Sequence, residues 1–497
     1  MDRIRALGLI AATALLAGAC GSAAPSAAPS AAPPSQGGGA ASAAATEAPS
    51  AASEAPSSTT SAGGAPVELR WYCCLGGGEA PEQKKVEDKV VADWNAAHPD
   101  IHVTFEVVTY EGNVANETLA TELQAGNGPD VVGPVGIGGA NAFKGKWLDL
   151  APLIQKNNYD LSGFPEQVVD IYKLDEGQVG IPFAIYPSVL FYRKGAFEEA
   201  GLNEPPHKWG DQYTMPDGSK VDWTYDTARE IGKKLTVDKS NKDATQAGFD
   251  PKHISQWGFE LQRDDLRGTG AYFGAGQLSS GPDGKTVQIP DTWAAGWKYY
   301  YQSIHTDHMD MTDAQFQSKD INPNDYPFFT GNVAMSLNFL WSTYGLSDLD
   351  DWDMAAVPSF NGKQTSVLNA DTFRILKSSK HPDEAFQFLS YLLGDASQDL
   401  LTAYGGFPAR TADQAAGIES LQAQFKNTVD WQVAVDGANY PDNPNFESWM
   451  PAYNESLGLV GSGGKYLTRW GTTPGLDMDT EIANLKKDLQ AIWDKAP

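Results

Sequence analysis

The feature that most constrains the fold is a regular alternation of strand and helix patterns between residues 67 and 136. "VELRWYCC", "IHVTFEVV" and "PDVVGPVG" either alternate apolar and polar residues or are continuously apolar, so they are predicted strands. Between them, "PEQKKVEDKVVADWNAA" repeats Val86, Val90 and Trp94 every four residues, and "NETLATELQA" spaces its leucines in the same way. Such spacing is typical of amphipathic helices. The alternation predicts a parallel sheet covered by helices, which is an α/β fold.

The carboxyl ends of these strands are the first candidate binding region. In sheets of this kind, ligands bind beyond the carboxyl ends of the strands. The first strand ends with Trp71, Cys73 and Cys74, the second is followed by Glu111, and the third ends in the Gly-rich run "GPVGIGGAN". We expect the four named side chains to contact a ligand. The glycines would let backbone N–H groups approach it closely.

The first twenty residues predict export. "MDRIRALGLIAATALLAGAC" places Arg3 and Arg5 before an apolar run that is too short to span a membrane. Its ending, Leu-Ala-Gly-Ala-Cys, resembles a bacterial lipobox, in which the cysteine is acylated and becomes the new N-terminus. We therefore expect residues 1–20 to be a lipoprotein signal peptide and Cys20 to be lipidated on the outer face of the cell membrane. Ordinary signal cleavage, with Cys20 incidental, is the alternative.

Residues 21–66 have the composition of a disordered tether. They are almost entirely Ala, Ser, Pro, Gly and Thr, with Glu47 and Glu54 as the charged residues. Such a segment cannot bury enough apolar surface to fold. The chain after it has globular composition and exceeds one typical core, so two lobes are expected.

The charge balance limits the possible partners. The chain carries 63 Asp and Glu against 36 Lys and Arg, a formal net charge of −27. This charge disfavours nucleic acid and anionic lipid as partners. We therefore expect membrane attachment through the lipid anchor only.

The chain contains only three cysteines, and two of them are adjacent. With Cys20 acylated, Cys73 and Cys74 have only each other as intramolecular partners in an oxidising exterior. The sequence leaves two interpretations open. They form a vicinal disulfide, or they are two small hydrophobic residues at a strand end.

Several motifs after residue 67 together resemble bacterial extracellular solute-binding proteins of the maltose-binding type. They occur in the order found in that family, and the likeness covers essentially all of 67–497. The motifs are "GNGPDVVGP" with "WLDLAPLI", "VGIPFAIYPSVLFYRKGAFEEAGL", "FFTGNVAMSLNFLW", "AAVPSFNGKQTSVLNADTFRILKSSKHPDEAFQFLSYLL" and "GGFPARTAD".

The resemblance implies a type II periplasmic-binding-protein-like fold with two α/β lobes joined by crossing segments. The first lobe would comprise 67–182 and 374–414, and the second 183–373 and 415–497. A small solute would be held between the lobes, and lobe closure would present the loaded protein to the permease of an ABC importer. We expect a monomer whose ligand is a sugar or an oligosaccharide.

The resemblance also implies particular ligand contacts. Trp341 falls at the family's sugar-stacking position, and Tyr186 falls where members place a ligand-contacting side chain. Asp371 stands at the second crossing, where its carboxylate could accept hydrogen bonds from hydroxyl groups. Core packing for Trp341 and a backbone-turn role for Asp371 are the alternatives. Trp257, Trp449 and Arg410 are further candidates, in "QWGFE", "NFESWMPAY" and "GGFPARTAD".

Two other functional classes remain to be weighed. The same importer role could serve a polyol, a glycerol phosphate or another non-sugar ligand. An exported carbohydrate-active enzyme is the other alternative, but the sequence contains no Gly-x-Ser-x-Gly nucleophile motif and its histidines show no metal-ligand spacing. "TVDKSNKDATQAGFD" faintly resembles a calcium loop, but it lacks the Gly-x5-Glu spacing of such a loop and has Lys242 at a ligand-spaced position. We therefore expect no catalytic residues, no metal and no cofactor.

Overall fold

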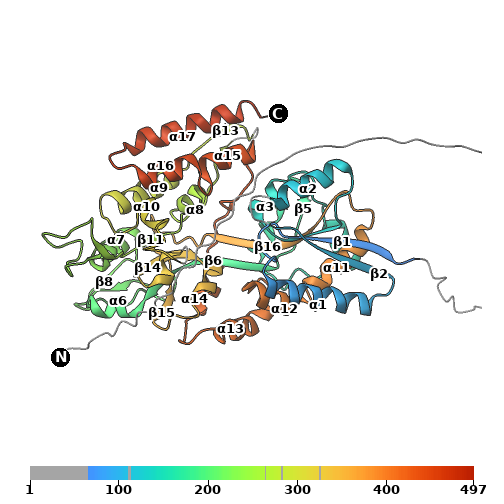
Figure 1. The fold of residues 1–497 in the computed structure, drawn as a ribbon, viewed down its shortest axis with the longest axis horizontal. Helices are drawn as coiled ribbons and strands as arrows, with labels where there is room; N and C mark the ends of the chain where they lie inside the picture. The colour runs from blue at the N-terminus through green and yellow to red at the C-terminus, as the bar shows by residue number, and fades with distance from the viewer. Residues whose placement is uncertain (1–64, 110–113, 264, 281–283, 324–325, 497) are drawn as a thin grey trace, which may run out of the picture. The chain divides into compact units, whose positions relative to one another are not determined.

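The computed structural model describes residues 65–109, 114–263, 265–280, 284–323 and 326–496 (Figure 1). These residues belong to one compact unit, 64–497. The predicted signal peptide, nearly all of the tether, and the candidates Cys20 and Glu111 lie outside the described residues. Within the described part of the chain, no helix has both the length and the apolar character that a bilayer crossing requires.

The predicted strand–helix alternation is confirmed. Its elements are β1 (Val67–Cys73), α1 (Pro81–Ala97), β2 (Ile101–Val107), α2 (Val114–Ala125) and β3 (Val131–Gly136). β1 pairs in parallel with both β2 and β3. Because Val90 and Trp94 lie on one side of α1, that side is buried against the sheet. The carboxyl ends of the three strands therefore meet at one edge, as the sequence predicts.

Two long strands extend this sheet toward the C-terminal part of the chain. β16 (Leu368–Ile375) is antiparallel to β3 and to β6 (Ala184–Arg193). β6 changes partners along its length. Its first residues pair with β16 and β17 (Phe407–Pro408), and its last residues pair with β14 (Met335–Phe339) and β15 (Trp352–Ala355).

The resulting sheet has the strand order β11-β14-β6-β16-β3-β1-β2, with β11 at Glu260–Leu261. In Figure 1, β6 and β16 run side by side through the middle of this arrangement. The fold is thus mixed α/β around a central mixed sheet, and the strands at its centre lie in the two segments predicted to cross.

The remaining elements surround the sheet. The helices are α3 (Ile137–Asn141), α4 (Ala151–Asn157), α5 (Glu166–Asp170), α6 (Lys194–Glu199), α7 (Tyr225–Leu235), α8 (Leu266–Ala271), α9 (Asp291–His305), α10 (Asp313–Phe316), α11 (Pro382–Leu392), α12 (Ser397–Tyr404), α13 (Gln414–Gln422), α14 (Gln432–Gly437), α15 (Tyr453–Val460), α16 (Lys465–Thr472) and α17 (Met478–Trp493). Short 3-10 helices are η2 (Pro327–Thr330), η3 (Leu340–Gly345) and η4 (Thr411–Asp413). Two-stranded ribbons are β4 (Lys173–Leu174) with β5 (Gly177–Gln178), β7 (Tyr213–Thr214) with β8 (Lys220–Val221), β9 (Val237–Asp238) with β10 (Ile254–Gln256), and β12 (Ser279–Ser280) with β13 (Thr286–Val287).

Most aromatic residues form the core. Trp71 packs between the rings of Phe105, Phe373 and Phe388, which joins β1 to β2, β16 and α11. A separate cluster around Trp297 and Trp470 lies between α9 and α16. The number of aromatic residues alone therefore does not locate a binding site, because most of these large rings are buried in the core.

Candidate functional site

A cavity of about 710 Å³ lies where the ends of β3, β6 and β16 meet. It adjoins a second cavity of about 540 Å³, with which it shares Gly139, Trp341, Asn369 and Glu447. We call the two together the central cavity.

The pairing of β6 with β16 brings three polar side chains to one face of the sheet. Tyr186 lies directly opposite Asn369, and Asp371 follows two residues later on β16. Directly opposed residues and residues two apart share a face of a sheet. All three line the cavity, so the predicted candidates Tyr186 and Asp371 lie together.

Trp341 supplies an aromatic wall to the same space. It lies in η3, just after β14, and its indole Nε1 donates a hydrogen bond to Asn369 Oδ1 at 3.1 Å. Its ring stacks on Phe339 at 6.0 Å and meets the edge of Tyr326 at 5.7 Å. These contacts fix the indole while it still borders both parts of the cavity.

The Asp371 carboxyl group lies beside a glycine that leaves room for it. A Cβ atom on Gly136 would lie 3.3 Å from Asp371 Oδ1. Burial, with a smaller contribution from repulsion by Glu447, raises the pKa of Asp371 to about 7, although hydrogen bonding with Tyr186 acts in the opposite direction. Asp371 therefore titrates near neutral pH.

Glu447 is a cavity residue that the sequence did not single out. The Gly138 backbone N–H donates to its Oε2 at 3.2 Å, and a Cβ atom on Gly138 would lie only 2.6 Å from its Oε1. Burial raises the pKa of Glu447, whereas the charge of Arg267 lowers it. The sequence predicts that backbone N–H groups after this strand approach a ligand. At Gly138, the N–H group donates to the Glu447 side chain, 309 positions away.

Arg267 also lines the cavity, but its charge is engaged by a neighbour. Its Nη2 and Nε donate to Asp265 Oδ2 at 2.6 and 3.0 Å, and its Nη1 lies 3.4 Å from the Ser448 carbonyl oxygen. Both side chains are largely buried. The Asp265 carboxylate thereby offsets the free-energy cost of removing the guanidinium from water.

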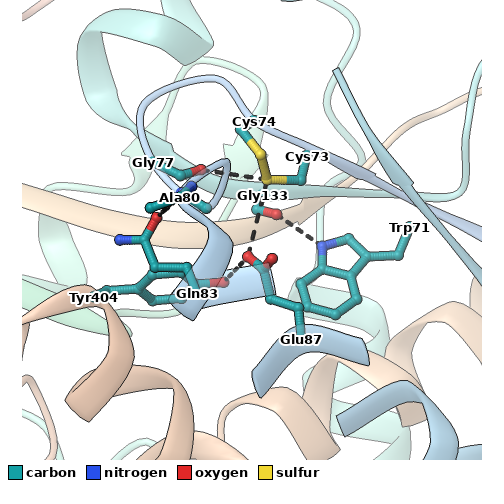
Figure 2. The surroundings of a disulfide bond; sticks show 10 residues. Trp71, Cys73, Cys74, Gly77, Ala80, Gln83, Glu87, Gly133 and Tyr404 are labelled. Carbon is teal, nitrogen blue, oxygen red and sulfur yellow. Dashed lines mark hydrogen bonds between the residues drawn. A yellow bond between two sulfur atoms is a disulfide. The ribbon is translucent and has the colours of Figure 1, made fainter. Parts of the chain in front are cut away.

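The two adjacent cysteines lie behind the cavity wall. Cys73 and Cys74 are fully buried and their sulfur atoms contact each other, whereas Leu75–Gly77, which follow them, line the cavity (Figure 2). Cys73 Sγ lies 4.0 Å from Glu87 Oε1. Neither cysteine is among the described residues that line the cavity, so ligand contact by Cys73 and Cys74 stays a prediction.

Glu87 links the cysteines to another cavity residue. It is fully buried, and it accepts a hydrogen bond from the Tyr404 hydroxyl at 2.5 Å. Burial raises the pKa of Glu87 to about 7. Tyr404 itself lines the cavity, and its hydrogen bond to Glu87 joins α12 to α1 beside the site (Figure 2).

Four other predicted residues lie elsewhere. The Trp71 indole is in the core and donates to the Gly133 carbonyl oxygen at 2.7 Å. Trp257 is likewise buried in the core. Arg410 packs over the Phe164 ring, and Trp449 lies under the Lys144 ammonium at 3.7 Å, in a neighbouring cavity of about 780 Å³.

The described residues offer no built metal site. Among them, no three or more His, Cys, Asp or Glu side chains are grouped so that they could hold an ion. The loop that faintly resembles a calcium site is closed by Asp238, whose carboxylate accepts backbone N–H groups from Ser240, Lys242 and Asp250.

Comparison with known proteins adds three findings. The sequence profile described as bacterial extracellular solute-binding protein matches residues 77–399. A lactose-binding protein of Rhizobium radiobacter is 25% identical over 379 residues, which cover 70% of this chain and 78% of that protein. An uncharacterized lipoprotein of Streptomyces antibioticus, encoded in the oleD 5′ region, is 25% identical over 70% of this chain and 72% of its own length.

The fold also has solved counterparts. The sugar-binding protein MalE of Xanthomonas citri superimposes with a TM-score of 0.64 at 17% identity, over 86% of this chain and 98% of that one. At this identity the likeness concerns the fold alone, which is that of the periplasmic binding proteins.

Proposed function

Because this chain belongs to the bacterial extracellular solute-binding protein family, we propose that it captures a small carbohydrate and delivers it to the permease of an ABC importer. One observation carries the proposal. The Trp341 indole borders a cavity of about 710 Å³ together with Tyr186, Asn369 and Asp371. Carbohydrates present apolar C–H faces and hydroxyl groups, so an aromatic wall beside amide, carboxyl and phenol groups matches their chemistry. The lactose-binding relative supports the same ligand class.

Capture would proceed by closure of two lobes, 67–182 with 374–414 and 183–373 with 415–497. The cavity wall draws on both, since Gly136 and Tyr404 belong to the first lobe and Trp341 and Glu447 to the second. A ligand that contacts both lobes favours the closed form, because only that form makes both sets of contacts. The closed monomer would then be the form that the permease recognises.

Export and lipid anchoring complete the proposal. Cys20 would be acylated and the tether 21–66 would hold the folded part near the outer face of the membrane. The similar Streptomyces antibioticus lipoprotein supports this proposal. Radiolabelled palmitate incorporated by the wild-type chain, and not by Cys20→Ala, is the expected result in an expression host that processes lipoproteins.

Thermal-shift screening of sugars, polyols and organophosphates tests the ligand class. A ligand at 100 times its Kd stabilises the native protein by about 2.7 kcal/mol. We expect sugars to raise Tm in the wild type and to raise it much less in Trp341→Ala. A response to polyols or organophosphates alone would replace the carbohydrate proposal. Products formed from a glycan library would show an enzyme instead of a binding protein.

We also propose that Cys73 and Cys74 form a vicinal disulfide that holds the Leu75–Gly77 loop against the cavity. Their burial beside Glu87 and their contact with each other support it. The intact mass should rise by about two daltons on reduction, since each thiol gains one hydrogen. An unchanged mass would mean that the two cysteines are free thiols.

A further inference from the structure

The carboxyl groups that line the central cavity outnumber its cations. Among the described residues in its wall, Asp265, Asp371 and Glu447 carry carboxyl groups, whereas Arg267 is the one cation. Asp265 meets Arg267 through paired hydrogen bonds. Among the described residues, neither Asp371 nor Glu447 forms an ion pair, and the charge of Arg267, already paired with Asp265, acts on Glu447 only as a neighbour.

These two carboxyl groups converge on one short stretch of backbone. Asp371 Oδ1 lies 3.3 Å from the Cβ position of Gly136, and Glu447 Oε1 lies 2.6 Å from that of Gly138. Glycine at both positions leaves the space that the two side chains occupy. Repulsion between them contributes to the raised pKa of Asp371, and both groups are desolvated by burial. The fold thus holds two carboxyl groups in one cavity where ionising both costs free energy.

An aromatic surface completes the same wall. Trp341 borders the cavity on both sides, and the edge of Tyr326 meets it at 5.7 Å. The faces of aromatic rings attract cations, and a ring beside carboxylates attracts them more strongly than either group alone. The same ring can stack on the C–H face of a sugar. The wall is therefore suited to a ligand that is both cyclic and positively charged.

Resting on the proposed function, we propose that the saccharide taken up by this protein carries a protonated amino group, which is bound by Asp371 and Glu447. An ammonium group has three N–H donors and no acceptor, so it complements two carboxylates more fully than a hydroxyl group does. It also neutralises charge that a neutral sugar would leave uncompensated in a desolvated site.

Calorimetric titration of the mature protein with matched sugars tests this inference. The pairs are glucosamine against glucose, and the glucosamine disaccharide against its N-acetylated form. We expect each amino member to bind tighter than its partner by about tenfold or more. Asp371→Asn and Glu447→Gln should each reduce this ratio to about threefold or less. The matched controls Asp488→Asn and Glu481→Gln, on the distant helices α16–α17, should keep the wild-type ratio.

The outcomes separate the two proposals. A wild-type protein that binds the neutral members as tightly as the amino members would overturn the amino-sugar inference and leave carbohydrate capture standing. A wild-type protein that binds no saccharide of either kind would overturn carbohydrate capture as well. The comparison in the wild type does not depend on the variants, so it holds even if a variant fails to fold.

Discussion

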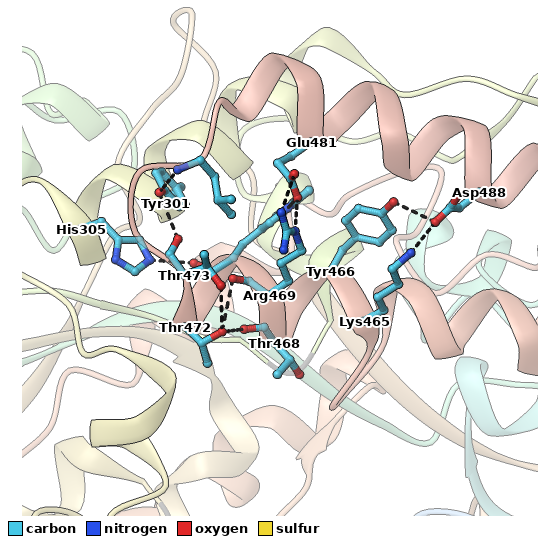
Figure 3. A network of polar contacts seen from close by, with 12 residues as sticks. Tyr301, His305, Lys465, Tyr466, Thr468, Arg469, Thr472, Thr473, Glu481 and Asp488 are labelled. Atoms are coloured by element: carbon cyan, nitrogen blue, oxygen red, sulfur yellow. Dashed lines mark hydrogen bonds and ion pairs between the residues drawn. The ribbon is translucent and has the colours of Figure 1, made fainter.

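Carboxyl groups on the C-terminal helices and in the central cavity have pKa values shifted in opposite directions. On α16–α17, Arg469 Nε lies 2.7 Å from Glu481 Oε2, and Asp488 Oδ2 accepts from Lys465 at 2.6 Å (Figure 3). Hydrogen bonds to these cations lower the pKa of Glu481 and of Asp488. In the cavity, burial and mutual repulsion raise the pKa of Asp371.

This difference separates carboxylates that stabilise the fold through ion pairs from carboxyl groups to which we assign a role in ligand binding. Tyr466 and Trp470 add further hydrogen bonds to Asp488 and Glu481, so the helix pair satisfies its carboxylates internally. In the cavity, Glu447 has the Gly138 backbone N–H at 3.2 Å and Asn369 as hydrogen-bond partners and the nearby charge of Arg267, but burial still raises its pKa. The following predictions test whether the two regions differ as described.

The largest expected effect is on the pH dependence of stability. Asp371 has an ordinary pKa of 3.8 and a native pKa of about 7. Between these values the native protein binds more protons than the unfolded chain, so the free energy of unfolding falls as pH rises from about 4 to 7. The Asp371→Asn variant lacks this loss. Its free energy of unfolding, relative to that of the wild type, should therefore increase by at most about 4 kcal/mol as pH rises over that range. Urea unfolding at several pH values measures it.

Glu481→Gln is the control with the opposite sign. Its pKa is lowered in the native protein, so Glu481 contributes stability above its ordinary pKa of 4.5, and that contribution is lost as pH falls through the native pKa. The deficit of this variant should therefore be present at neutral pH and disappear in acid. Parallel curves for the wild type and both variants would contradict the proposed contrast.

The next effect is on affinity. Trp341→Ala should weaken binding of the identified sugar by about 30-fold, roughly 2 kcal/mol, because the stacking wall is lost. Trp449→Ala, in the neighbouring cavity under Lys144, should leave the Kd unchanged. Calorimetry on both variants makes the comparison. Equal losses would mean that the ligand reaches beyond the central cavity and that Trp449, predicted from the sequence, contacts it.

The smallest effect concerns the helix pair alone. Glu481→Gln should lower Tm by about 2 °C at neutral pH, since the half-exposed Arg469 leaves the ion pair weakened by solvent. Ligand affinity should not change, because α16–α17 contribute no residue to the described cavity wall. A change in Kd would show that these helices couple to the site.

Local periodicity explains why the first half of the sheet could be predicted. The apolar residues of β1, α1 and β2 repeat with strand or helix spacing within each segment, and no distant contact is needed to recognise them. Trp71 shows the limit of this reasoning. Its place near a strand end was correct, but its side chain points to the face of the sheet that Phe373 and Phe388 cover. The sequence does not say which face of a strand will be covered.

The site was predicted in part because some of its residues lie in short, recognisable motifs. Tyr186, Trp341 and Asp371 lie in motifs that resemble the family, and the structure brings all three to one cavity. Glu447 stands next to the predicted Trp449, but among 63 acidic residues nothing local marks it. Tyr404 is similar, because its role depends on Glu87, 317 positions earlier in the chain.

Sequence alone therefore determined the elements and the strand ends that border the cavity, because these follow from spacing within short segments, while the resemblance of its motifs indicated the family. Tertiary structure alone decided which carboxyl groups are paired and which are not. Pairing depends on the distance between side chains and on burial, and both arise only when segments such as Gly138 and Glu447 are brought together by the folded chain.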